Sequence, residues 1–440
     1  MTALALRSLR HRPTAAVATF LAALLGTALT ASFGTLVESA LSTHDDDREL
    51  LIIMGSIVGG WAALIVLFSV ASTVGIVAGQ RTREAGLLRT IGATPRQVRA
   101  LIVYEAGVVV LLAASAGAVV ASVGGPALFG ALQRGDLVTP ASTYAGGPAS
   151  LSSAAGVVVL VGTVAAGIAS RRATRGAAAF SLRQVDVPEH RLHRWRILVG
   201  VLLVAVGLAS AVATVTVTGK ADDAYAAMQT SGSASIVVGV GLATLAPGLL
   251  RLLATPLRPL LAMSGSGHLA AANTTRRAHL LAGALAPVIV LVSTAVGTLL
   301  MIGIDERTLT AAGDPEGVGG TITMINFVVI GMICLFTAIM VVNASVAVVA
   351  HRRPELDRLW RLGATAAQLR SSIVLEAAVV AVIGILLGLL GSTATAVPYS
   401  IVRHEGVVPD GQLWLPPLIA VAAAVLTVGA AWGAQRRSAR

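Results

Sequence analysis

The sequence predicts an all-α integral membrane protein with about ten transmembrane helices, and its composition, apolar runs and internal repeat support this fold class. Of its 440 residues, 55% are apolar and 12% are charged, and the mean hydropathy is +0.83. A soluble domain carries about 25% charged residues, so this chain cannot bury its apolar surface in a water-soluble core. Its apolar runs alternate with short basic segments, and two of those segments are copies of one another.

The apolar runs give the number of spans, because a transmembrane helix needs about 20 mostly apolar residues. Ten runs meet this requirement. They are Thr14–Leu36, Leu50–Ala78, Ala100–Val123, Ala149–Ser170, Ile197–Thr218, Ser235–Leu253, Leu280–Ile304, Thr321–Ala350, Ser371–Val397 and Leu413–Gly433. The run Leu50–Ala78 is longer than one crossing needs, so we expect it to tilt or to continue into the cytosol as a helix.

The distribution of charge fixes the orientation. With the N-terminus inside and the spans alternating, the inside segments hold 27 Arg and 7 acidic residues, and the outside segments hold 5 basic and 14 acidic residues. This bias follows the positive-inside rule and predicts a multi-pass membrane protein with both termini cytoplasmic. The first run could instead be a signal peptide, with a basic start and small residues at Ala31 and Ser32, but its apolar stretch is long for one.

The net charge of +11 does not indicate nucleic-acid binding, because the basic residues lie beside apolar spans rather than on a polar domain. The segment 171–196 is a basic linker that we expect to hold anionic lipid headgroups. Its basic residues are Arg171, Arg172, Arg175, Arg191, Arg194 and Arg196. The single Cys334 lies in an apolar run, where it is interpreted as a small packing residue.

An internal repeat relates the two halves of the chain. Between Arg81–Val109 and Arg352–Val380, 14 of 29 residue pairs are identical. Chance would give about three matches in so skewed a composition, so the repeat is real. Two spans precede each copy within its half and two follow it, so the repeat is parallel. The predicted layout is a four-helix module (1–170), the linker (171–196), two linking helices with a connector (197–267) and a second module (268–440).

Each copy of the repeat reads as a helix that stops and restarts. In the first copy Leu87, Leu88 and Ile91 form an apolar stripe at helical spacing. Gly92 ends this helix, since glycine adopts the left-handed cap without steric cost. Thr94, with Gln97 three residues later, forms a capping box that starts a short helix leading into the next span.

The second copy has the same helix stop at Gly363 and the same capping box, formed by Thr365 and Gln368. We call residues 83–106 the first elbow and residues 354–377 the second elbow. A basic loop that only contacts headgroups would need the charge but not the caps. Because both copies keep the same caps, we expect another protein to dock on the elbows.

The two elbows, "REAGLLRTIGATPRQVRALIVYEA" and "PELDRLWRLGATAAQLRSSIVLEA", resemble the FtsX-like permease family of ABC transporters, a superfamily that includes MacB-like exporters. The resemblance covers nearly the whole chain. It implies that the elbows couple the permease to a cytosolic ABC ATPase, with two ATPase copies for one chain, and that this chain binds no cofactor itself. The implied coupling residues are Glu84, Gly92, Ala93, Thr94, Gln97, Arg99, Glu355, Gly363, Ala364, Thr365, Gln368 and Arg370.

The second elbow departs from the family pattern, because Pro354 and Asp357 replace Arg83 and Gly86. Proline inside the stem would kink it, so we expect the second elbow to bind its ATPase differently. Many relatives also carry a large extracytoplasmic domain, whereas the outside loops here are short, with Gly124–Pro148 the longest. This difference argues against export across the whole periplasm.

The sequence contains no phosphate-binding loop, and the dipeptide Gly219-Lys220 lacks the residues that such a loop requires around it. It also lacks the Cys and His spacing of a zinc site. The acidic stretch after His44 is interpreted as a solvated loop. The alternative is an acidic rim outside that attracts cationic amphiphiles. That rim would consist of Glu38, Asp45, Asp46, Asp47, Asp222, Asp223, Asp305, Glu306, Asp314 and Glu316.

Two carboxylates open the spans that follow the elbows. We expect Glu105 and Glu376 to cap a helix or to pair with a stem arginine, rather than to relay protons. No acidic residue lies at midmembrane depth in a predicted span, which argues against an ion-driven carrier. Glycines at four-residue spacing, such as Gly384 and Gly388, are interpreted as helix packing positions.

The sequence therefore predicts the permease subunit of an ABC transporter in the bacterial inner membrane. We expect this subunit not to be an enzyme itself. We expect it to export or extrude a hydrophobic or amphipathic compound, such as an antibiotic or peptide. The main alternative is a membrane subunit that moves no cargo and signals mechanically to a partner outside. The short outside loops leave such a partner little surface to bind.

Overall fold

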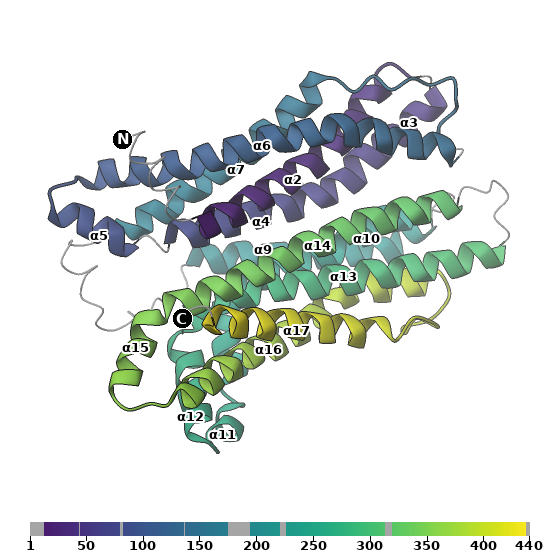
Figure 1. Ribbon diagram of the computed structural model, residues 1–440. Coiled ribbons are helices and arrows are strands. Elements are labelled where there is room, and N and C mark those ends of the chain that lie inside the picture. The colour runs from purple at the N-terminus through teal and green to yellow at the C-terminus, as the bar shows by residue number, and fades with distance from the viewer. Residues whose placement is uncertain are drawn as a thin grey trace. The chain divides into compact units, whose positions relative to one another are not determined.

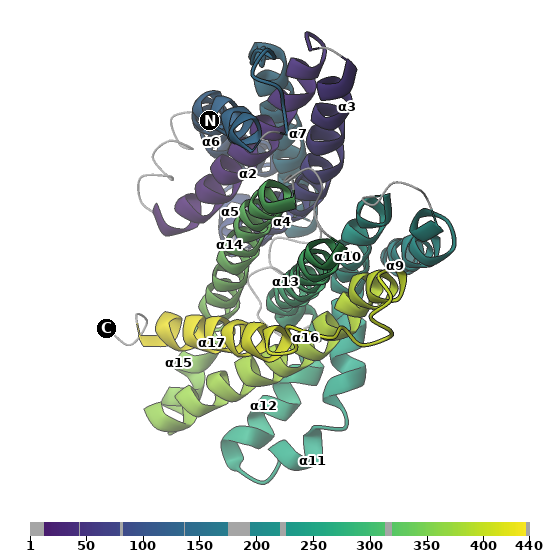
Figure 2. The same cartoon turned by 90° about the vertical axis from the view of Figure 1, so that its right-hand side faces the viewer.

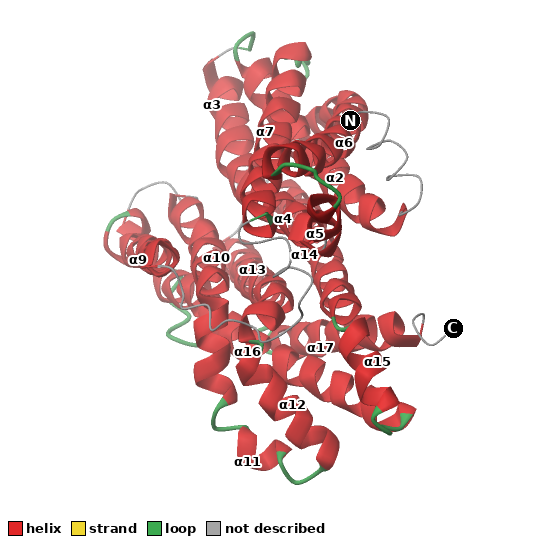
Figure 3. Cartoon of the chain, turned by 90° about the vertical axis from the view of Figure 1, so that its left-hand side faces the viewer, coloured by secondary structure: helices red, strands yellow, loops and turns green. Residues whose placement is uncertain are grey.

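The computed structural model describes residues 13–43, 45–79, 82–135, 137–174, 194–220, 226–312 and 319–436. Within these ranges every regular element is a helix, and no strand is present (Figure 3). Eight of the described helices are long and apolar enough to cross a membrane. The predicted all-α membrane fold is therefore confirmed.

Eight of the ten predicted spans correspond to these apolar helices. They are Thr19–Ala40, Pro95–Arg134, Pro148–Arg171, Arg194–Lys220, Ala226–Ala254, Ala278–Thr308, Ala366–Val402 and Leu415–Gln435. Helices α4 (Gly59–Gly79) and α14 (Gly319–His351) lie in the other two predicted spans. Their 21 and 33 residues are also enough to cross a bilayer.

The chain divides into two compact units, Met1–Asp186 with Glu316–Ile325, and Val187–Pro315 with Asn326–Arg440. The linking helices therefore group with the second module. The first unit is an antiparallel helical bundle (Figure 1). Besides α4, its elements are α2 (Pro13–Ala40), α3 (Asp45–Ile53), the π-helix η1 (Met54–Val58), α5 (Thr82–Thr90), α6 (Pro95–Arg134) and α7 (Pro148–Ala173).

The second predicted span begins earlier than its apolar run. Helical residues run from Asp45 to Gly79, with the π-helix η1 in the middle. Gly55 lies within this π-helix and Gly59 directly follows it, and a Cβ at Gly59 would lie 2.6 Å from Phe33 Cβ on α2. The extra length therefore lies at the end away from the first elbow, and α2 packs closely against the wider turns. At the end nearer the first elbow, α4 ends at Gly79 and helix α5 begins at Thr82.

The second unit contains the linking helices and the second module. Besides α14, its elements are α9 (Arg194–Thr216), the 3₁₀-helix η2 (Thr218–Lys220), α10 (Ala226–Ala254), α11 (Arg258–Leu261), α12 (Gly265–Arg276), α13 (Ala278–Ala312), α15 (Arg353–Arg361), α16 (Ala366–Val402) and α17 (Leu415–Arg436). Viewed along the long helices, α12 extends beside the first turns of α16 (Figure 2).

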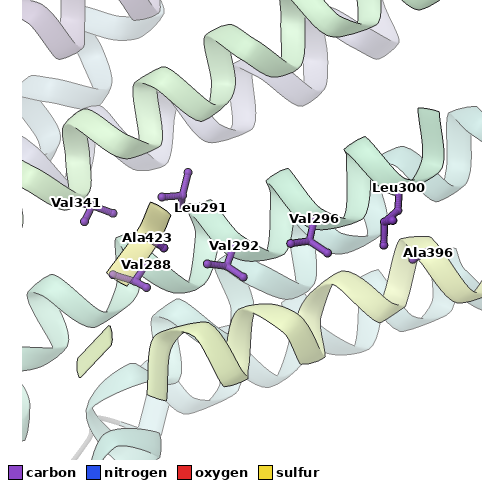
Figure 4. Packing of buried hydrophobic residues seen from close by; sticks show 8 residues of the cluster. All are labelled: Val288, Leu291, Val292, Val296, Leu300, Val341, Ala396 and Ala423. Carbon is purple, nitrogen blue, oxygen red and sulfur yellow. The ribbon is translucent and has the colours of Figure 1, made fainter. Parts of the chain in front are cut away.

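Helix α13 is the central helix of the second unit. Nearly all of its apolar stretch is buried, and it contacts α10, α16 and α17. Figure 4 shows its Val288, Leu291, Val292 and Val296 directed toward the neighbouring helices of one apolar cluster. Full burial of each such side chain contributes about 1.5–3 kcal/mol in water, but in lipid the gain comes mainly from close packing.

Small polar residues join α10 to α16. The Thr395 hydroxyl donates to the carbonyl of Ser231 at 2.6 Å and accepts from the backbone N–H of Ser235 at 2.9 Å. Ser293 on α13 donates to the carbonyl of Ser235 at 2.7 Å. These hydroxyls find partners across helices, as buried polar groups in a membrane must. The second linking helix is thus bonded into the second unit.

Most of the basic linker lies outside the described residues, which resume at Arg194. Of the predicted basic residues, Arg196 is partly buried, and its Nε donates to the carbonyl of Thr244 on α10 at 2.6 Å. The guanidinium therefore binds the neighbouring helix. In contrast, α9 leaves Leu198, Leu202 and Val212 more than half exposed, as expected of a face in contact with lipid.

Candidate functional site

The first elbow begins where α5 ends in a Schellman motif. The N–H of Ala93 donates to the carbonyl of Leu88 at 2.9 Å, and the N–H of Gly92 donates to the carbonyl of Arg89 at 3.2 Å. Gly92 has φ of +104°, a conformation that costs a residue with a Cβ about 1–2 kcal/mol. A Cβ there would meet no atom within 4 Å. Backbone conformation rather than packing therefore requires glycine at this position.

The capping box predicted at Thr94 is present. The Thr94 N–H donates to Gln97 Oε1 at 2.9 Å, and the Gln97 N–H donates to Thr94 Oγ1 at 3.3 Å. However, the short helix expected after it is not a separate element. Helix α6 runs without interruption for 40 residues from Pro95 to Arg134, because no helix-breaking residue stands between the box and the span. The elbow is consequently the extended end of a membrane helix.

The second elbow has the same glycine helix end and the same capping box. Gly363 has φ of +95°, and its N–H donates to the carbonyl of Trp360 at 3.0 Å. Thr365 and Gln368 form the second capping box, with N–H to oxygen distances of 2.9 and 3.2 Å. Helix α16 then continues for 37 residues. The stop and restart predicted from the sequence is therefore confirmed at both copies.

Pro354 does not kink the second stem, contrary to the sequence prediction. Helix α14 ends at His351, Arg352 occupies the N-cap position, and α15 starts at Arg353. Pro354 consequently lies in the first turn of α15, where no helical partner for its missing N–H is needed. The proline starts a new helix rather than distorting a continuous one.

The tip of each elbow exposes apolar side chains to solvent. Ile91 and Leu362 occupy equivalent positions in the repeat and are 81% and 83% exposed. Leu87 in the first elbow and Trp360 in the second are also more than half exposed. Large exposed apolar groups around a rigid turn mark a protein contact. The sequence pattern placed Leu87 and Ile91 on an apolar stripe, but it did not show that they face outward.

Arg99 and Arg370 are equivalent in the repeat but make different contacts. Arg99 Nε donates to the hydroxyl of Thr174 at the end of α7 at 2.7 Å, and Arg89 Nη1 donates to the Thr174 carbonyl at 3.3 Å. Arg370 Nε donates instead to the carbonyl of Ala366 in its own helix at 3.1 Å. Thus Arg99 holds the first elbow against α7, whereas Arg370 remains exposed.

The predicted glutamates differ from the rest of the site because they face inward. Glu355, in the first turn of α15, pairs with Arg277 and with Arg352. Glu376 is buried and pairs with Arg352, which confirms the expected pairing with a stem arginine. In the first elbow Glu84 is half-buried and Glu105 is buried. Of the predicted residues, the exposed ones are therefore Gly92, Thr94 and Gln97 in the first elbow and Gly363, Thr365, Gln368 and Arg370 in the second, whereas Ala93 and Ala364 are half-buried.

At the opposite end of the first unit, two acidic residues of the predicted rim hold a loop in place. Asp47 Oδ2 accepts hydrogen bonds from the hydroxyls of Thr139 and Ser142, both at 2.6 Å. Glu38 Oε2 accepts from the backbone N–H of Ser150 at 3.0 Å. These carboxylates are engaged structurally, so they do not form a free rim for cationic ligands.

The corresponding end of the second unit is also internally paired. Asp305 Oδ1 binds Arg403 Nη2 at 2.6 Å and accepts from the hydroxyl of Tyr399 at 2.5 Å. Arg307 binds both carboxylate oxygens of Glu405 at 3.0 and 2.9 Å. His44 and the rim residues Asp222, Asp223, Asp314 and Glu316 lie outside the described residues.

No cluster of three His, Cys, Asp or Glu side chains that could hold a metal occurs among the residues that the structure describes. The elbows likewise bring together caps, amides and apolar tips, but no nucleophile with a base. Their chemistry suits docking of another protein.

A comparison with protein families agrees with this arrangement. A family model described as FtsX-like permease C-terminal matches residues 56–178 and 327–440, more than half of the chain. The two matches start at positions 56 and 327, which are offset from each other as Arg81 is from Arg352 in the internal repeat. Each match contains one elbow with the two long helices after it. A comparison with curated proteins gave no match.

Proposed function

Since the chain belongs to the FtsX-like permease family, we propose that it exports a hydrophobic or amphipathic compound, driven by a separate ATPase. The family makes the chain an ABC transporter-type permease subunit of the membrane. The proposal adds two cytosolic ATPase subunits, one for each elbow. A separate ATPase agrees with the sequence, in which no phosphate-binding loop is found.

The observation on which this proposal depends is that the two elbows present the same rigid turn. Gly92 and Gly363 have similar φ angles, at +104° and +95°. Thr94 and Thr365 start the following helices with ψ of 153° and 154°. Two equivalent sockets, one in each half of a single chain, match the two identical subunits of a dimeric motor.

The proposed cargo is suggested by the membrane surface of the protein. Long apolar helices leave their apolar faces exposed, while acidic groups at the end away from the elbows are bonded internally. An amphipathic compound could be handled along such a surface without a wide polar channel. Chemical recognition of one particular compound is not part of the proposal.

The experiment that tests the proposal is crosslinking at the tips of the elbows. Thr94→Cys and Thr365→Cys, each in the Cys334→Ala background, would carry a photoactivatable crosslinker in native membranes. We expect both positions to capture a nucleotide-hydrolysing partner. Val123→Cys, exposed on the same long helix as Thr94 but far from the elbow, is the matched control and should capture none.

Transport is tested separately from docking. The complex in nanodiscs should show higher ATP hydrolysis with amphipathic peptides or hydrophobic antibiotics than without them. If both elbows capture an ATPase but no compound stimulates it, the chain is a mechanical transducer instead of an exporter. If neither elbow captures an ATPase, the proposed function is wrong.

A further inference from the structure

A cluster of five polar residues attaches the second elbow to helix α12. Arg277, directly after α12, pairs with Glu355 of α15, and Asn273 Nδ2 donates to Glu376 Oε1 on α16 at 2.9 Å. Arg352 pairs with Glu376 and, through Nε at 3.3 Å, with Glu355. We call these five residues the α12 clasp. It joins α12 to both sides of the elbow.

The clasp is largely shielded from water. The side chains of Arg352 and Glu376 are each 3% exposed, and those of Arg277 and Glu355 are about a quarter exposed. Two guanidinium groups face two carboxylates, so the charges balance. Separating a buried pair leaves charges without partners, which is far more costly than separating an exposed pair. The elements that the clasp joins should therefore move together.

Helix α12 leads directly into the centre of the second unit. It ends at Arg276, Arg277 is its cap, and α13 starts at Ala278. Because α13 is buried among α10, α16 and α17, a shift of its first turn must displace helices around it. A movement of the second elbow can thus reach the core of the unit through one covalent connection.

Among the residues that the structure describes, the first elbow also has an attachment to a helix end. Arg89 and Arg99 bond it to Thr174 at the end of α7. The described contacts thus attach the first elbow to α7 and the second elbow to α12.

A small cavity of about 30 Å³ lies beside the clasp. It is lined by Ser345, Arg352, Glu376, Thr427 and other residues of four helices. Arg352 Nη2 and Ser345 Oγ are both buried without a hydrogen-bond partner. A space of this size holds a water or two, so there is room for water to bond to these two groups.

We propose that the α12 clasp transmits movement of the second elbow to α13, and that Asn273, Arg277 and Arg352 are positioning residues for this step. The inference rests on the proposed function, because it takes the ATPase as the source of movement. It adds the route within the second unit: the second elbow displaces α12 and, through Arg277, the start of α13.

The test compares Arg277→Gln with Arg276→Gln in the complex captured from native membranes. Both variants remove one positive charge, but Arg276 is exposed and lies outside the clasp. Hydrogen exchange would be measured on the complex in nanodiscs, without nucleotide and after trapping with ATP and vanadate. In the wild type and in Arg276→Gln, we expect trapping to change exchange in α15, α12 and the start of α13.

Arg277→Gln should keep the response in α15 and lose it in α12 and α13. Arg277→Lys keeps the positive charge beside Glu355 and should retain most of the response, which would separate loss of the ion pair from a general effect of substitution at this position. Two results would overturn the inference but not the proposed function. In the first, the response in α12 persists in Arg277→Gln. In the second, α15 responds in the wild type but α12 does not. Failure of Thr365→Cys to capture an ATPase would overturn the proposed function and the inference together.

Discussion

Arg99 Nε donates a hydrogen bond to the Thr174 hydroxyl at 2.7 Å and so joins two helix ends that lie 75 residues apart in the chain. Thr174 itself is buried, and its hydroxyl also donates to the carbonyl of Ser170 at 2.9 Å. One side chain therefore closes α7 and anchors the first elbow. The first elbow depends on this threonine for its position relative to α7.

Replacing Thr174 with valine should loosen both helix ends. The valine keeps the shape but removes the acceptor for Arg99, and a hydrogen bond to a charged group contributes about 1.5–3 kcal/mol when well shielded. Because Arg99 is partly exposed, we expect a loss nearer to about 1 kcal/mol. Faster amide exchange in the first turns of α6 and the last turn of α7 is the measurement. Thr174→Ser keeps the hydroxyl and should behave as the wild type.

The sequence was sufficient to predict the turns of the elbows because their determinants are local. Gly92 and the pair Thr94 and Gln97 act through bonds between residues at most five positions apart. Such patterns can be read without knowing what surrounds them. The approximate bounds of the long apolar helices were predicted for the same reason, since hydropathy and length are also local properties.

The attachments behind the elbows could not be predicted in this way. Thr174 and Arg277 are ordinary residues in their own segments, and their partners lie 75 and 78 residues away. Pro354 was misinterpreted because it was assigned to the interior of a continuous stem, whereas it lies in the first turn of a new helix, where proline is favoured. The exposure of Ile91 could not be predicted either, because it depends on how the chain between α5 and α6 turns at Gly92.

Alanine at Gly92 or Gly363 should destabilise the corresponding elbow. Both glycines have positive φ, and an alanine there costs about 1–2 kcal/mol even though space is open. Lower unfolding temperatures at one fixed scan rate would show this. Gly429→Ala is the control, because a Cβ at Gly429 meets nothing within 4 Å and its helix needs no positive φ. An equal loss for Gly429→Ala would contradict the conformational explanation.

Replacing only Arg352 should destabilise the protein more than replacing both Arg352 and Glu376. Arg352→Met leaves the carboxylate of Glu376 buried without its cation, which costs about 3–5 kcal/mol. The double variant Arg352→Met with Glu376→Leu removes both charges and should recover much of that loss. Thermal unfolding in nanodiscs at one scan rate measures the difference. A double variant as unstable as the single one would show that the loss comes from packing instead of charge.

The exposed tips should determine ATPase capture without affecting the fold. Ile91→Ser and Leu362→Ser change side chains that are 81% and 83% exposed, so unfolding temperatures should stay near the wild type. An apolar group buried on docking contributes about 25 cal/mol per Å², and we therefore expect each serine to reduce capture at its own elbow at least tenfold. Crosslinking yield from Thr94→Cys and Thr365→Cys, measured separately, gives the result for each elbow.

The matched control for this last experiment is Val120→Ser, which changes an exposed apolar residue within the membrane part of α6. It should leave capture unchanged at both elbows. If both serine variants still capture the ATPase as well as the wild type, the apolar tips are not the docking surface.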